Sequence, residues 1–154
     1  MKVSTIRVSV VMLALGVVCS SHSIAQTPAT RSPACLHYDP HVVRITGILI
    51  TEPHYGPPNF GETPDQDKKV DVPMLQLAEA VDVCGDPTSA ADQDTVRNVR
   101  KVQVVGRRIN LKAFIGQEVA VTGYLFEAHT ANHHTKVLIR AESIRVYDRA
   151  PRRL

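Results

Sequence analysis

Three histidines near the end of the chain are the sharpest candidate for chemistry. His129, His133 and His134 lie within six residues, in a stretch rich in Thr, Ala and Asn that is typical of a turn between strands. Neutral imidazole is a common ligand of Zn and Cu. Neighbouring side chains point to opposite faces of an extended strand, so at most one of His133 and His134 would readily join His129. The pattern allows two interpretations: a metal site, or histidines that only hydrogen-bond the turn.

A complete metal site would need a further ligand from elsewhere in the chain. The side chains available for this role are His37, His41, His54 and Glu127.

A second candidate site lies in the proline-rich stretch from 51 to 68. Tyr55 and Phe60 flank a rigid Gly-Pro-Pro, and Asn59 directly precedes the second ring. Two rings held by a stiff turn suit stacking on a sugar ring or contact with a peptide. In the alternative interpretation the prolines stiffen a long loop while one ring folds back over the open end of a barrel. Tyr55, Asn59 and Phe60 are the candidate ligand-binding residues.

The sequence carries no recognisable catalytic motif. It has neither a Gly-x-Ser-x-Gly elbow nor a His-Glu-x-x-His pair. Glu127, or one of Asp65, Asp67 and Asp71, would serve as a general base on paper, but charged residues are common in loops. We therefore expect a protein that binds rather than one that catalyses.

The first 25 residues have the three parts of a secretory signal peptide. Lys2 and Arg7 give a basic start, residues 8–19 are apolar, and Ser23 and Ala25 are the small residues that signal peptidase prefers. The apolar run is shorter than the roughly 20 residues that a membrane span needs. We expect cleavage after Ala25, no transmembrane segment, and a periplasmic or secreted product.

The three cysteines indicate one disulfide. Cys19 lies in the signal peptide; lipid attachment at Cys19 is the competing interpretation, which the bulk of Val18 disfavours. Cleavage leaves Cys35 and Cys84 in an oxidising compartment, where we predict that they pair. The alternative, two ligands of a metal, would need additional Cys or His ligands.

Composition and charge indicate one ordinary globular domain. The 154 residues are 44% hydrophobic and 21% charged, too apolar for a disordered chain. The formal net charge of +3 falls to about +1 without the signal peptide, which holds two basic and no acidic residues. We expect a flexible leader at 26–34, a domain at 35–148 and a basic tail at 149–154. Nucleic acid is not an expected partner of an exported protein.

Runs of β-branched residues predict an all-β domain. We predict one helical turn over 110–116 and strands at 42–50, 69–77, 81–84, 99–105, 118–126 and 135–146. Pro53 is expected to end the first strand. Gly47 and Gly123 stand in similar Thr-Gly segments, and glycines at strand centres let a small barrel curl. The order predicts a small, partly open Greek-key barrel of the oligonucleotide/oligosaccharide-binding (OB) type, with a β-sandwich as the alternative.

Several segments together resemble the bacterial exported domain of unknown function 4431. They are Cys35 to Pro40, Thr46-Gly47, Gly56 to Phe60, Val119 to Leu125, His133 to Thr135 and Val137 to Ile139. The resemblance extends from about 35 to 147 and implies an exported bacterial module with a barrel-like fold and no established activity. It assigns no catalytic residues.

These observations lead to one expectation and one alternative. We expect a secreted or periplasmic module that binds an envelope protein, a peptide or a saccharide through the 51–68 and 127–135 loops. The alternative is a metal-binding protein that uses His129, His133 and His134.

Overall fold

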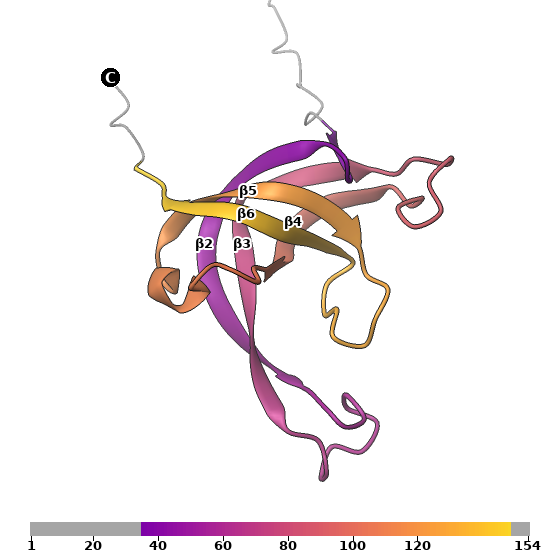
Figure 1. The fold of residues 1–154 in the computed structure, drawn as a ribbon, viewed down its shortest axis with the longest axis vertical. Coiled ribbons are helices and arrows are strands. Elements are labelled where there is room, and N and C mark those ends of the chain that lie inside the picture. Colours follow the sequence, from indigo (N-terminus) through magenta and orange to yellow (C-terminus); the bar gives the residue numbers. More distant parts are fainter. Residues whose placement is uncertain (1–34, 149–154) are drawn as a thin grey trace, which may run out of the picture. The chain divides into compact units, whose positions relative to one another are not determined.

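Short β-branched runs, interrupted by Gly, Pro and Asp, form the strands of this chain (Figure 1). The structure is a computed structural model that describes residues 35–148. The elements are β1 (Leu36–His37), β2 (Val42–Tyr55), β3 (Lys69–Cys84), β4 (Val96–Val105), the 3-10 helix η1 (Leu111–Phe114), β5 (Glu118–Glu127) and β6 (Val137–Val146). The predicted signal peptide, leader and basic tail lie outside the described residues. No helix within 35–148 is long and apolar enough to cross a membrane.

Five of the strands pair in a continuous ring. β2 lies antiparallel to both β3 and β5, and β3 pairs antiparallel with β4. β6 closes the ring because it pairs antiparallel with β5 and parallel with β4. β1 adds a short parallel pairing at the end of β3. The ring-like pairing confirms the predicted all-β fold, with which a barrel-like arrangement or a sandwich is consistent.

The core fills the inside of the ring. Leu49, Leu75 and Val102 are register partners on β2, β3 and β4, and all three are almost completely buried. Successive side chains along a strand point to opposite faces of the sheet. The residues next to Leu49, Leu75 and Val102 in their strands therefore point outward. Leu111 on η1 packs into the same core, which explains why the helical turn is needed between β4 and β5.

Two glycines allow neighbouring strands to approach closely. A Cβ atom on Gly47 would lie 2.1 Å from the carbonyl oxygen of Gln76, and one on Gly123 would lie 2.1 Å from that of Arg140. No side chain fits at such a distance. Both glycines are thus required by the same kind of contact, the close approach of a neighbouring strand.

The prediction that Pro53 ends the first strand is wrong. β2 continues to Tyr55, and Pro53 pairs with Asp71 of β3. β2 pairs with β5 only as far as Ile48, so one edge of β2 is free at Pro53. A free edge tolerates a residue without an N–H group.

The separate strands predicted at 69–77 and 81–84 are one strand. β3 runs without interruption from Lys69 to Cys84, with register shifts against β4 between Gln76 and Val83. Residues 78–80, which separate the two predicted strands, lie in this irregular stretch. A β-bulge bends a strand without ending it.

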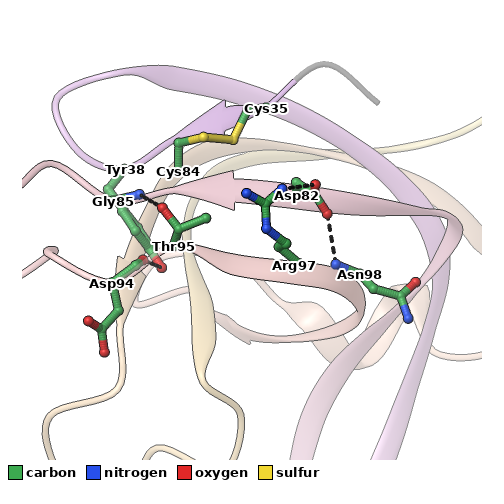
Figure 2. The surroundings of a disulfide bond; sticks show 9 residues. All are labelled: Cys35, Tyr38, Asp82, Cys84, Gly85, Asp94, Thr95, Arg97 and Asn98. Atoms are coloured by element: carbon green, nitrogen blue, oxygen red, sulfur yellow. Dashed lines mark hydrogen bonds and ion pairs between the residues drawn. A yellow bond between two sulfur atoms is a disulfide. The ribbon is translucent and has the colours of Figure 1, made fainter. Parts of the chain in front are cut away.

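The predicted disulfide is present and fixes the start of the described chain (Figure 2). Cys35 and Cys84 are bonded, with their Cα atoms 5.8 Å apart. The bond ties the two-residue β1 to the end of β3, where Leu36 pairs with Val83. Next to it the Tyr38 hydroxyl donates to the backbone oxygen of Asp94, as Figure 2 also shows.

Candidate functional site

The side chains of β2, β3 and β4 that point away from the core share one face, here called the outer face, in which Val72, Met74 and Gln103 are buried. Register places Ile48 opposite Gln76 and Lys101, and Ile50 opposite Met74 and Gln103. The members of the outer face are Ile48, Ile50, Glu52 and His54 of β2, Val70, Val72, Met74 and Gln76 of β3, and Lys101 and Gln103 of β4.

An ion pair crosses the outer face from β2 to β4. Lys101 Nζ lies 2.8 Å from both carboxylate oxygens of Glu52. These hydrogen bonds lower the pKa of Glu52; desolvation opposes the shift, and the charges of Lys101 and His54 add to it. His54 Nε2 lies 3.7 Å from Glu52 Oε2, too far for a hydrogen bond. Within the described chain this buried Nε2 atom has no hydrogen-bond partner.

A buried glutamine fastens the 128–136 loop to the outer face. Gln103 is 8% exposed; its Nε2 donates to the Asn132 oxygen at 2.9 Å, and its Oε1 accepts from the His134 backbone N–H at 2.7 Å. The Gln103 backbone N–H donates to Thr135 Oγ1 at 3.0 Å. The oxygen and the nitrogen of this buried side-chain amide both have hydrogen-bond partners in the loop, so Gln103 holds the loop in one position.

His134 makes the contact between the two candidate regions. Its ring stacks on that of His54, with the ring centroids 4.1 Å apart and the planes 24° from parallel. Desolvation lowers the pKa of His134, and the neighbouring His54 and His133 lower it further, so this site favours the neutral His134 ring. The 128–136 loop therefore borders the same face on which the β2–β3 hairpin presents its loop.

The structure does not bring the three predicted metal ligands together. His129 and His133 contact each other edge to face at 4.7 Å, while His134 turns away to His54. His133 Nδ1 accepts the His129 backbone N–H, and His129 Nδ1 bonds the Glu127 carbonyl oxygen. No group of three or more His, Cys, Asp or Glu side chains within 35–148 is placed to hold a metal ion. His129 and His133 thus hydrogen-bond the turn through their rings, whereas the ring of His134 stacks on His54.

The other candidate residues lie at the tip of the β2–β3 hairpin. Tyr55 ends β2, and the Lys69 ammonium lies 5.3 Å from the centre of its ring. Gly61 packs against the same ring. Asn59 and Phe60 follow in the 56–68 loop, and Phe60 has a positive φ of 53°. All three candidates thus belong to one loop region next to the outer face.

The 56–68 loop is organised by a carboxylate that sequence reasoning had considered only as a general base. Asp67 accepts backbone N–H groups of Asn59 and Gly61 at 2.7 Å and of Thr63 at 3.3 Å. Desolvation raises the pKa of Asp67, but the three donors outweigh it and lower the pKa overall. Asp67 is therefore a structural centre of the loop that presents Phe60.

Three residues of the outer face were missed by sequence reasoning. Glu52 and Lys101 are 49 positions apart, and only strand register shows that they meet. Gln103 had a visible signal: it is the one polar residue in the run from Val102 to Val105. A lone amide among β-branched residues indicates a buried polar partner.

We expect the free energy of unfolding to decrease as the pH falls below about 6.5. The pKa values of His133 and His134 are lowered in the folded state, chiefly by desolvation, so the unfolded chain binds more protons in this range. Their contribution is complete above the ordinary histidine value and declines below it. Urea unfolding between pH 7.5 and 5.5 measures the slope. The variant His133→Asn/His134→Asn should flatten it, and an unchanged slope would contradict this origin.

Comparison with known proteins gives one family match. Residues 101–145 match the family described as "Domain of unknown function (DUF4431)". The matched segment begins at Lys101 in β4 and continues through η1, β5 and the 128–136 loop into β6, so it contains Gln103 and His134. No curated protein and no solved structure matches the chain.

Proposed function

Residues 101–145 match the DUF4431 family, and from that premise we propose that the protein is an exported binding module which holds a saccharide on its outer face. The ligand would lie across β2, β3 and β4, between the 56–68 loop and the 128–136 loop. The family description assigns no activity, so the proposal depends on the geometry of the face.

The observation that carries the proposal is the stack of His54 on His134. It brings a loop that follows β5 to the side of the barrel on which the β2–β3 hairpin projects. OB-type barrels bind oligosaccharides or oligonucleotides on the second and third strands, between the loops after the first and fourth. Here those strands are β3 and β4, and those loops are 56–68 and 128–136.

The chemistry of the face favours an uncharged polar ligand. Ile48 and Val70 are 45% and 37% exposed, and they offer apolar contact for the C–H face of a sugar. Lys101 and Glu52 offer a donor and an acceptor between them, but their charges cancel. An oligonucleotide would need several unpaired cations along its backbone, which argues for a saccharide over a nucleic acid.

Export is supported by two features of different kinds. The Cys35–Cys84 bond is compatible with an oxidising compartment, since disulfides are rare in the cytosol. The first 25 residues have the order of basic, apolar and small residues that signal peptides share. A periplasmic or secreted location with cleavage near Ala25 is part of the proposal.

NMR titration of the 26–154 chain with chitotetraose and cellotetraose tests the function. We expect saturable shifts for amides of β2, β3 and the two loops with at least one of these saccharides. Tyr55→Ala and Phe60→Ala should each weaken binding about fivefold, because an aromatic contact contributes about 1 kcal/mol.

Tyr124→Ala is the matched control. Tyr124 lies on β5 under Arg140, away from the outer face, so this variant should bind normally. Equal weakening by all three variants would contradict a site at the hairpin tip. Amide shifts on addition of a peptide, without shifts on addition of either saccharide, would show that the ligand is a peptide and not a saccharide.

A further inference from the structure

A second surface of the barrel lies where β2, β5 and β6 pair, and it carries two arginines. Arg44 of β2 is the register partner of Thr122 on β5, and Thr122 is the partner of Ser143 on β6. In the adjoining row Ala120 is the partner of Arg145. Because register partners of antiparallel strands share a face, these five side chains point to the same side.

A β-bulge in β6 creates this arrangement. Thr122 pairs with Ser143 and Gly123 pairs with Ala141, so Glu142 is an additional residue. Ala141 faces the core before the bulge, and Ile144 packs against the core after it. The extra residue thus reverses the alternation and turns Ser143 and Arg145 outward. Bulges often redirect a side chain next to a functional site.

The five side chains line a surface hollow of about 410 Å³. Arg44 and Arg145 supply its positive charge, and Thr122 and Ser143 supply its hydroxyl groups. Its lining consists of Arg44, Ala120, Thr122, Ser143 and Arg145. Ala120, the register partner of Arg145, contributes only a methyl group to this lining. No carboxylate is part of this lining, so the hollow has a charge of +2.

Both arginines are available to a ligand. Both side chains are exposed, and neither takes part in any of the four ion pairs found within 35–148. The Arg44 guanidinium lies 6.0 Å from the centre of the Tyr147 ring. Glu79 and Glu118 line a separate hollow that shares only Arg44 with this one.

We propose that this hollow binds the phosphate group of a small soluble phosphate monoester. Guanidinium groups present paired N–H donors that match phosphate oxygens, and the Thr122 and Ser143 hydroxyls add donors from a third side. Donors on several sides suit a tetrahedral group better than a planar carboxylate. A volume of about 410 Å³ lies at the lower end of small-molecule sites, which favours a compact ligand over a membrane surface.

Titration of the labelled 26–154 chain with glycerol 2-phosphate at constant ionic strength tests the proposal. We expect saturable amide shifts centred on residues 120–122 and 143–145, and inorganic phosphate should compete. Arg44→Gln and Arg145→Gln should each weaken binding about tenfold, since charge-assisted hydrogen bonds are the strong ones. The variant Arg44→Lys/Arg145→Lys keeps both positive charges but loses the paired N–H donors of the guanidinium groups. It should also bind glycerol 2-phosphate less tightly than the unchanged chain.

Arg97→Gln is the control, because it removes the same charge from an exposed position on β4, where Arg97 pairs with Asp82. It should bind as tightly as the unchanged chain. Equal weakening by Arg97→Gln, or shifts that do not saturate, would overturn the proposal. Binding to phosphatidylglycerol vesicles without binding to glycerol 2-phosphate would also overturn it.

Discussion

Replacing Cys35 and Cys84 by serine is expected to lower the free energy of unfolding by roughly 4 kcal/mol. The bond closes a loop with a sequence separation of 49, so its loss releases a large entropy in the unfolded chain. It also secures β1, whose two residues pair with β3 at only two positions. Urea unfolding of Cys35→Ser/Cys84→Ser beside the oxidised chain measures the difference.

The reduced chain is the control for this prediction. It lacks the bond but keeps both cysteines, so it separates the loss of the cross-link from the effect of two serines. Both forms should unfold at a similar urea concentration, well below that of the oxidised chain. If the urea midpoint of these forms equalled that of the oxidised chain, the disulfide would not stabilise the fold by restricting the conformations of the unfolded chain.

Gly123→Ala is expected to lower the free energy of unfolding by about 3 kcal/mol, as overpacking against backbone does. The added Cβ would lie 2.1 Å from the Arg140 carbonyl oxygen and 3.0 Å from the Ala141 Cα. Both contacts are with backbone, so β5 and β6 must separate to admit the methyl group. Chemical denaturation gives the size of the effect.

Gly116→Ala is the matched comparison. Gly116 has a φ of +82°, but nothing lies within 4 Å of the position that a Cβ would take. Its substitution should cost only the backbone strain, about 1 kcal/mol. If Gly116→Ala were as destabilising as Gly123→Ala, strand approach would not be the dominant requirement at Gly123.

Local pattern was sufficient to predict most of the fold. Alternation of β-branched residues identified β2, β4, β5 and β6, and the glycines at 47 and 123 indicated the curvature of a barrel. The errors came from long-range context. Pro53 is tolerated because an edge is free, and β1 exists because a disulfide and β3 hold it, neither of which local sequence records.

The sequence pointed to the two loop regions of the candidate site but not to the residues that connect them. The 51–68 and 127–135 regions do border one face, yet the residues that connect them come from distant strands. The role of Gln103 depends on a loop about thirty positions later, and His134 parts from His133 because His54 offers a ring to stack on. Strand register decides these contacts, and register is a property of the whole sheet.

The ring closes with β6, the last strand of the described residues 35–148. β6 links β5 to β4, which are otherwise unpaired with each other, so a nascent chain that ends before Val137 exposes two strand edges at once. Such edges recruit other strands and promote aggregation. The closed ring of this domain therefore cannot form before β6 has been synthesised. β6 thus protects two strand edges from other chains as well as completing the ring.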